Sequence, residues 1–355
     1  MACDVDQNSV FPMSAAEWSR ALARFKTPTN GRAFIELALT LVPFVVTWIL
    51  IYIAWTWRVP WAAVPLAVVA SGLLVRLFLI QHDCGHNAFF ANRRANDWVG
   101  RILGVLTLTP YAHWRRAHAV HHATHGNLDR RGVGDVDTLT VGEYLARSRW
   151  ARWRYRLYRH PLVMFGIGPA YVFLVTNRIP AGFMRGGWRP WLSTMGTNFA
   201  IALAGAALVQ ALGIGVLLTV HAPIVLMAAT AGVWLFYVQH QFERSYWTHA
   251  DAWTFRDAAL LGSSYYAMPA VLRWFTANIG VHHVHHLSSG IPFYRLPDVL
   301  RAHPALAATN RLTLRRSLGC AALALWDGPS RRLVRFADLR RAVPDTAQPS
   351  KEPPC

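Results

Sequence analysis

The sequence predicts an all-α integral membrane protein with four membrane-spanning helices, and two observations favour this fold class. Of the 355 residues, 54% are hydrophobic and only 15% are charged, and the mean hydropathy is +0.22. Apolar runs of about 20 residues, the length needed to cross a bilayer, recur along the chain. The expected spans cover residues 33–57, 61–80, 194–213 and 217–239. A soluble two-domain protein of this length is therefore disfavoured.

The positive charge of the chain lies beside its apolar runs. The formal net charge is +18, and arginine far outnumbers lysine. Such a charge suits either nucleic acid or an anionic membrane surface. The sequence contains no helix-turn-helix, zinc-finger or RNA-binding signature, and stretches such as RSRWARWRYRLYRH alternate arginine with aromatic residues typical of a membrane interface. We therefore expect membrane lipids, and no nucleic acid, as partners.

The two ends of the chain are expected on the cytoplasmic side. Residues 1–32 form a polar lead-in with a short amphipathic piece, and they lack the early apolar core of a cleavable signal peptide. Their basic residues precede the first span, which places that end in the cytoplasm by the positive-inside rule. A membrane domain follows over residues 33–300, and residues 301–355 are expected to be a cytoplasmic segment with a disordered, Pro-rich tail.

Two shorter apolar runs and one arginine refine this topology. Residues 99–111 and 162–175 are too short to span and are expected to be interfacial or buried helices. Arg76, near the end of the second span, is expected to extend its side chain toward the cytoplasmic surface. The four cysteines form no CxxC pair and predict no disulfide framework, as suits a reducing compartment.

Histidines recur at helical spacing in three separate segments. Residues at i, i+3 and i+4 share one face of a helix, so the side chains of each segment can converge. The clustered positions are His82 and His86, then His118, His121 and His122, then His282, His285 and His286. An even number of spans separates the second segment from the third, so all three meet on one side of the membrane, where His240 also ends the fourth span. Solvated surface could explain one such segment but not three.

Nine convergent histidines are too many for one tetrahedral zinc and suit two metals with four or five ligands each. Two irons are expected, because imidazole suits iron. The Glu-x-x-His motif of soluble di-iron proteins is absent from the sequence, and a haem is disfavoured because the histidines are bunched at helix ends. His113, His125 and His283 fall off the ligand spacing and are interpreted as bystanders, and His221 is assigned to a turn on the far side.

The motifs HDCGH, HAVHH and HHVHH, together with GDVDTLT after the second and GSSYYAMPAVLRWFTANIG before the third, resemble those of the integral-membrane fatty acid desaturases, especially bacterial acyl-lipid enzymes of the omega-6 and delta-5 kind. The resemblance covers residues 33–300. It implies a four-span fold whose cytoplasmic cap holds a non-haem di-iron centre over an acyl-chain tunnel. The family's eight ligands fall on the eight clustered histidines, and His240 matches the ninth.

Four polar residues are candidates to orient the ligand rings, since a ligating imidazole usually donates its second N–H to a neighbour. They are Asp83, Asp137, Glu243 and Asn278. Asn278 lies four residues before His282 and shares its face if the helix continues. Surface or capping polarity is the alternative explanation for all four.

The resemblance implies an oxidative reaction in which O2 is the co-substrate and a cis double bond is introduced into a fatty acyl chain. Each turnover needs two electrons. The sequence contains no haem domain, CxxC spacing or GxGxxG motif, so an external donor of the ferredoxin or cytochrome b5 type is expected. A related hydroxylase or ketolase remains an alternative, and a non-catalytic metal-binding membrane protein is less favoured because the spans carry few polar residues. The bacterial inner membrane is the expected location.

Overall fold

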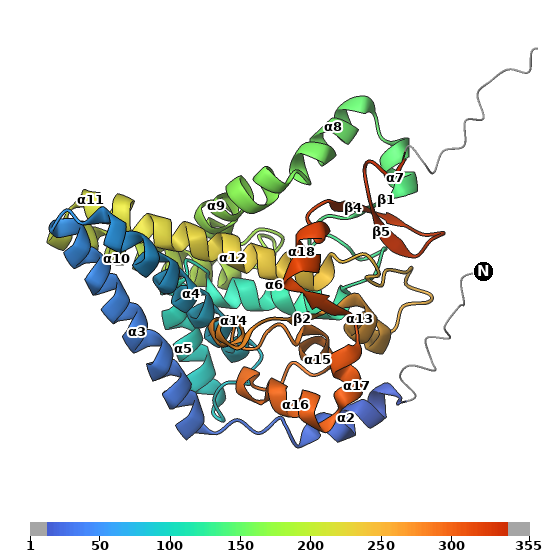
Figure 1. Ribbon diagram of the computed structural model, residues 1–355, viewed down its shortest axis with the longest axis horizontal. Helices are drawn as coiled ribbons and strands as arrows, with labels where there is room; N and C mark the ends of the chain where they lie inside the picture. The colour runs from blue at the N-terminus through green and yellow to red at the C-terminus, as the bar shows by residue number, and fades with distance from the viewer. Residues whose placement is uncertain (1–12, 340–355) are drawn as a thin grey trace, which may run out of the picture.

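The computed structural model describes residues 13–339, and four long helices dominate that part of the chain (Figure 1). Helix α3 covers Asn30–Thr56, α4 covers Pro60–Gly85 and α10 covers Trp188–Leu212. The fourth runs continuously from Ile214 to His240. Among the described residues, these are the helices long and apolar enough to cross a membrane, so the four-span prediction is confirmed. The first three extend further than predicted at the ends that lead toward the histidines.

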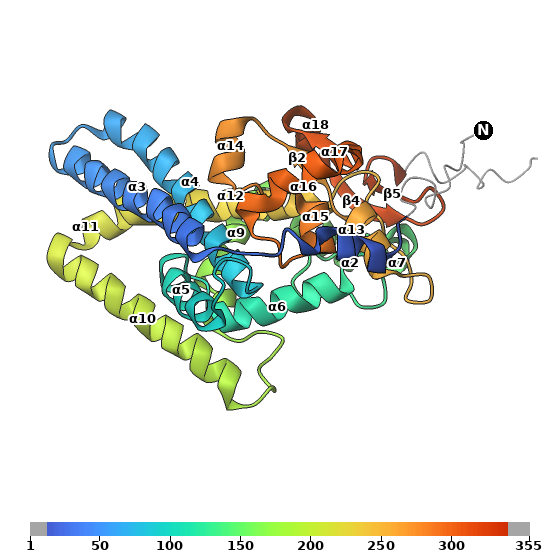
Figure 2. The same cartoon turned by 90° about the horizontal axis from the view of Figure 1, so that it is seen from below.

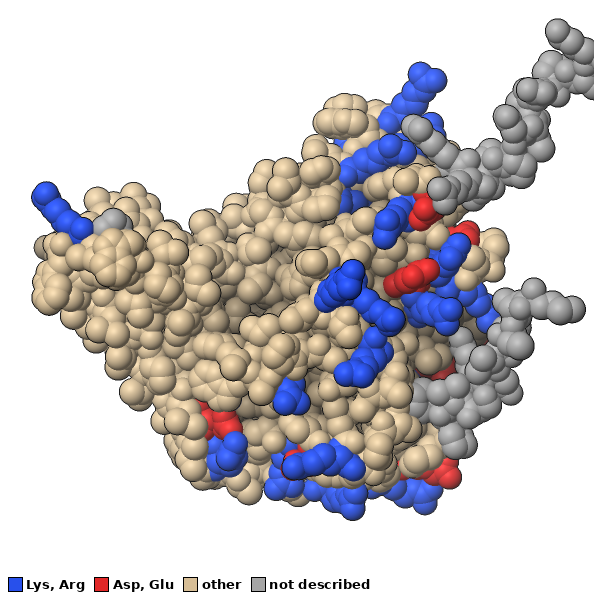
Figure 3. Space-filling view, in the orientation of Figure 1, with Lys and Arg blue, Asp and Glu red and all other residues tan. Residues whose placement is uncertain are grey.

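The four helices form two hairpins whose turns lie at the same end of the molecule (Figures 1 and 2). The α3–α4 turn contains Arg58 at φ 57°, and the turn after α10 contains Gly213 at φ 88°. The fourth helix begins with α11 (Ile214–Val216), continues through the π-helical turn η3 (Leu217–His221) and ends with α12 (Ala222–His240). Both α3 and α12 pack against α4. Lysine and arginine gather at the opposite end, which we call the cap (Figure 3).

The cap is built from short helices that come from every part of the chain. Its N-terminal member, α2, is the amphipathic piece expected before the first span, and it buries Trp18 and Leu22. The helices outside the spans are α2 (Ala15–Ala23), α5 (Arg93–Leu106), α6 (Tyr111–Thr124), α7 (Val141–Ala146), α8 (Arg149–Tyr158), α9 (Gly168–Leu174), α13 (Phe255–Gly262), α14 (Ala270–Phe275), α15 (His282–Leu287), α16 (Leu296–Ala302), α17 (Pro304–Ala308) and α18 (Leu314–Cys320), with shorter turns η1 (Val163–Ile167), η2 (Thr176–Arg178) and η4 (Phe293–Arg295).

Two small sheets join distant parts of the cap, and the sequence analysis did not predict them. The strands are β1 (Leu139–Thr140), β2 (Tyr265–Ala267), β3 (Arg311–Thr313), β4 (Leu323–Asp327) and β5 (Arg332–Arg335). β1 lies parallel to β4, β4 is antiparallel to β5, and β2 lies parallel to β3. Strands this short are too brief to show a period-two pattern of side chains. Through β3 and β4, the chain beyond residue 300 is tied to earlier segments.

The two short apolar runs are not among the candidate spans. The first overlaps α5, which packs against α4, and the second forms η1 and α9, which pack against α12. The expected disordered tail falls in residues 340–355, outside the described part of the chain.

The expectation for Arg76 is wrong. Its side chain is 2% exposed and turns inward, where its guanidinium pairs with Glu36 of α3 at 2.5 Å and donates to Thr40 at 3.0 Å. It also donates to the Trp274 carbonyl in the segment before the third histidine cluster. The carboxylate on the neighbouring helix supplies the counter-charge that a lone arginine in an apolar run would have to seek at the surface.

Candidate metal centre

The first two histidine clusters are placed by helix ends. His82 lies in the last turn of α4, and His86 is the residue that caps that helix. Helix α6 follows Pro110, contains no glycine or proline, and carries the second cluster in its last turns. It ends before Gly126, which adopts φ 74° and lies where a Cβ would approach the Tyr246 carbonyl to 2.9 Å. The pairs at i and i+4 in both clusters therefore face the same interior.

The third cluster lies on α15, a helix of only six residues. Helix α14 stops at Phe275, and Ala277 and Asn278 adopt positive φ, so the helix expected to run on to His282 is interrupted. A Cβ at Gly280 would lie 2.4 Å from the carbonyl oxygen of Tyr266 on β2. Only glycine therefore fits where the chain passes so close to β2. This turn fixes where α15 begins and thus where its imidazoles point.

All nine histidines meet in the interior, and they divide into two groups. The five-histidine group consists of His82, His86, His118, His122 and His285. The four-histidine group consists of His121, His240, His282 and His286. Within each group, one candidate ligand nitrogen from every ring lies within 4.8 Å of the others. Each group could hold a metal ion.

The spacing of the ring nitrogens fits a shared metal. In the five-histidine group, successive Nε2 atoms of His82, His118, His122 and His285 are 3.0, 3.1 and 3.1 Å apart. In the four-histidine group, His240 Nε2 lies 3.1 Å from that of His121 and 2.9 Å from that of His282. Nitrogens about 2.1 Å from one metal are about 3.0 Å apart at a right angle and about 3.4 Å apart at the tetrahedral angle. The separations therefore fit sites with more than four ligands.

Hydrogen bonds between the imidazole rings cannot explain all of these short nitrogen–nitrogen contacts. A neutral imidazole has one N–H donor and one lone pair. Burial, followed by repulsion from neighbouring histidines, holds the pKa well below the ordinary value for His86, His118, His122, His282, His285 and His286. Converging neutral rings present more lone pairs than hydrogens, and a cation resolves that imbalance.

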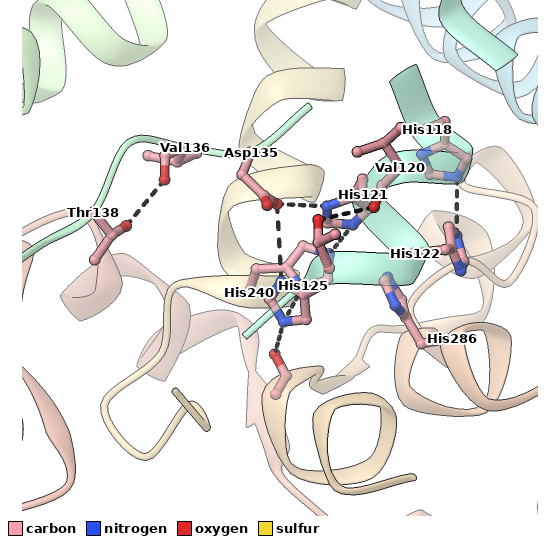
Figure 4. Close-up of polar contacts among 12 residues, drawn as sticks. His118, Val120, His121, His122, His125, Asp135, Val136, Thr138, His240 and His286 are labelled. Carbon is pink, nitrogen blue, oxygen red and sulfur yellow. Dashed lines mark hydrogen bonds and ion pairs between the residues drawn. The ribbon is translucent and has the colours of Figure 1, made fainter. Parts of the chain in front are cut away.

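Two carboxylates contact the histidines directly. Asp83 Oδ1 lies 3.2 Å from His82 Nδ1, and its Oδ2 accepts the Phe293 N–H at 2.7 Å. Asp135 Oδ1 lies 2.5 Å from His121 Nδ1 and 3.9 Å from His125 Nδ1 (Figure 4). Burial opposes ionisation of Asp135, yet attraction and hydrogen bonds from these two histidines lower its pKa. The sequence analysis overlooked Asp135, which stands two residues before the candidate it selected in GDVDTLT.

The other three polar candidates lie away from the rings. Asp137 is exposed, and its backbone contacts Tyr158 and Arg159. Glu243 is 65% exposed on its side chain and pairs with Arg332 at 3.6 Å. Asn278 donates to the Phe293 carbonyl at 3.3 Å, because the chain turns at Asn278 and does not continue the helix of His282.

The histidines that were interpreted as bystanders differ among themselves. His113 packs against the Phe183 ring, and His283 contacts the Leu306 carbonyl at 2.9 Å. His125 is buried within the centre, with Nε2 3.1 Å from His240 Nδ1. Together with His121 and Asp135 it forms a further set of side chains that could hold a metal ion, separate from the two histidine groups. It lies four residues beyond His121 and three beyond His122, so the helical spacing that grouped the other histidines was the signal that could have found it.

Four spanning helices and two convergent histidine groups define a polytopic membrane protein with a candidate metal centre. The family model described as fatty acid desaturase matches residues 59–317. The chain is 42% identical to a fatty acid desaturase of Bacillus subtilis over 322 residues, which cover 91% of each protein. It is 29% identical to an sn-1 acyl-lipid omega-3 desaturase (ferredoxin) of Synechocystis, and 27% identical to an acyl-lipid omega-3 desaturase (cytochrome b5) of Arabidopsis thaliana; the matches cover 66% and 68% of this chain and 66% and 64% of those relatives.

This chain belongs to the fatty acid desaturase family. It is a membrane-bound fatty acyl desaturase that acts on a lipid substrate and requires an electron donor. The histidine groups are compatible with the metal site of such an enzyme.

Proposed function

We propose that the chain introduces a cis double bond into the acyl chain of a membrane lipid. The reaction converts –CH2–CH2– to –CH=CH–, and the two hydrogens removed from the chain combine with O2, two electrons and two protons to give two molecules of water. The observation that carries the proposal is the convergence of nine histidine rings into two separate groups whose nitrogens fit shared metals. Two irons, when bound, supply the O2-derived oxidant that an unactivated methylene requires.

The nine histidines of the two groups are proposed as the ligands, each through Nε2 where the contacts specify an atom. Asp83 and Asp135 accept from Nδ1 of His82 and His121, which fixes the tautomer that turns Nε2 inward. Asp83 itself accepts a hydrogen bond from the Phe293 N–H. This bond ties the first histidine segment to the chain just after the third. The protein's part in the reaction is to position these rings and to exclude water.

The proposed donor is an acidic carrier of the ferredoxin or cytochrome b5 type, as in the names of the two relatives above. The basic cap suits such a carrier because opposite charges speed encounter. The gathering of basic residues at the cap also supports an inner-membrane orientation with cap and termini in the cytoplasm.

Expression in a bacterial host that lacks the product, followed by gas chromatography of its lipids and iron analysis of the purified protein, tests this function. We expect a new monounsaturated or further unsaturated chain and two irons per polypeptide. A hydroxylated chain would instead indicate oxygen insertion, and iron well below two per polypeptide under iron-replete conditions would refute the ligand assignment.

A further inference from the structure

The four-histidine group has a backing layer that reaches toward the surface. His125 is 1% exposed, and its ring centroid lies 4.0 Å from that of His240. Trp247 also packs against His125, with ring centroids 5.8 Å apart in an edge-to-face arrangement. A Cβ at Gly262 would lie 2.9 Å from His125 Nε2, so only glycine leaves room for this ring beside His240. Two aromatic rings therefore stand in series behind a candidate ligand.

Trp247 also lines a surface pocket of about 550 Å³. The indole is 5% exposed, and its Nε1 has no hydrogen-bond partner, so its role is not that of a donor that fixes a loop. The pocket is formed where the 247–249 loop meets the β4–β5 hairpin, and its rim includes His249, Trp326, Asp327 and Arg331. Trp247 thus both lines the pocket and contacts His125.

The centre has a second approach, at the five-histidine group. His86, His118 and His122 are only partly buried, whereas every member of the four-histidine group is buried. In Figure 4, His118 and His122 lie on the opposite side of His121 from Asp135 and His125. The acyl chain has to reach the metals, and these half-buried rings are where the centre is least covered. A carrier at the Trp247 pocket leaves that side free for the acyl chain.

We propose that this pocket receives an acidic one-electron carrier protein, and that Trp247 and His125 bridge it electronically to His240. The inference rests on the proposed function and names the place where its reductant acts. Electron tunnelling weakens steeply with distance, so closely spaced rings favour this route over one through loops. Each carrier molecule gives up one electron, so two carriers supply the two electrons that the formation of one double bond consumes. Trp247 and His125 are neither oxidised nor reduced overall.

The charge around the pocket determines whether an acidic or a basic carrier protein binds there. Arg331 lines the pocket, and Arg332, which pairs with Glu243, follows it on β5; both are exposed. Asp327, the acidic residue among those that line the pocket, accepts a hydrogen bond from Ser330 and keeps its charge, so the excess of positive charge comes from the surrounding basic cap. Close approach of a prosthetic-group edge to Trp247 therefore places acidic side chains of a carrier against arginine, an interaction that salt weakens.

Binding is measured first, with metal-free protein in nanodiscs and an oxidised plant-type ferredoxin. Arg331 adopts φ 47°, a conformation that aspartate tolerates, so we expect Arg331→Asp to weaken binding at least about tenfold through like-charge repulsion. The matched control is Arg58→Asp, which makes the same charge change at φ 57° in the turn between α3 and α4 and should leave the dissociation constant unchanged. Unchanged binding by Arg331→Asp overturns the docking site.

Electron transfer is measured next, by the oxidation rate of reduced ferredoxin in stopped flow. Trp247→Leu should lower that rate at least about tenfold, Trp247→Phe should restore most of it, and product formation driven by dithionite should stay intact. Trp18→Leu is the matched control, because Trp18 is also 5% exposed with an unpartnered Nε1 but lies on α2. A wild-type rate in Trp247→Leu, or equal loss with dithionite, overturns the bridge. A wild-type enzyme that forms no product even with dithionite would instead refute the proposed function.

Discussion

The five-histidine group and the four-histidine group use the same side chain in different surroundings. Three rings of the first are only partly buried, and Asp83 contacts one of its members. All four rings of the second are buried, and Asp135, His125 and Trp247 stand behind them. The comparison fits the division of labour proposed above, in which the first group faces the substrates and the second receives electrons through the protein.

Loss of a ring from either group should have the largest effect. His285→Ala and His282→Ala each remove a central Nε2 from one group, and we expect product to fall by more than about a hundredfold, beyond the usual cost of losing an outer partner. Gas chromatography of host lipids measures the product, and membrane fractionation checks insertion. His113→Ala, which alters a partly buried histidine outside both groups, should retain activity. Product at the wild-type level in either variant contradicts the assignment of that group.

Removal of an outer carboxylate should distinguish the two groups. Asp135→Asn keeps the shape of the side chain but weakens the acceptor for His121 Nδ1, so we expect metal affinity of the four-histidine group to fall about 10- to 100-fold. Iron content under limiting iron should drop by about one per chain, not two. Asp137→Asn, two residues away and exposed, is the control. An equal loss in both variants would show that the loop, and not the carboxylate, matters.

The histidine clusters show how far the sequence could predict the centre. With about 100° per residue, positions i and i+4 on a helix differ by about 40°, while i+3 lies about 60° to the other side. The structure follows this: His118 and His122 join one group and His121 the other, and His282 and His286 separate likewise from His285. Periodicity can therefore divide each cluster, but which group receives each part depends on how the helices cross.

The second carboxylate and the third histidine segment show where the sequence stops being informative. Asp135 and Asp137 stand in one irregular loop, and no periodicity states which of them turns inward. The Asn278 expectation assumed a continuous helix, whereas positive φ at Ala277 and Asn278 ends it. Arg76 failed for the same reason, because its partner Glu36 lies 40 residues away on another helix. These outcomes depend on tertiary contacts that local pattern does not encode.

Acid should destabilise the metal-free protein by protonating histidines of both groups when the chain unfolds. Six of the clustered histidines have a pKa well below the ordinary 6.5, chiefly because of burial, so they stay neutral in the folded state while the unfolded chain binds protons below about pH 6.5. Stability is therefore lost as the pH falls below about 6.5, by up to about 1.4 kcal/mol per pH unit for each of these histidines. Thermal unfolding in detergent with a chelator at pH 7.5 and 5.5 measures this. A midpoint that does not fall would contradict burial of neutral rings.

The smallest effect is expected at Glu243, which sequence reasoning placed beside the rings and the structure places at the surface. Its exposed pair with Arg332 is worth at most about 1 kcal/mol, so Glu243→Gln should leave iron content and product within about twofold of wild type and shift the unfolding midpoint only slightly. The same assays on Asp135→Asn give the contrast. If Glu243→Gln instead lost one iron per chain, the layer behind the four-histidine group would extend to Glu243. The two groups would then differ in the reach of that layer as well as in burial.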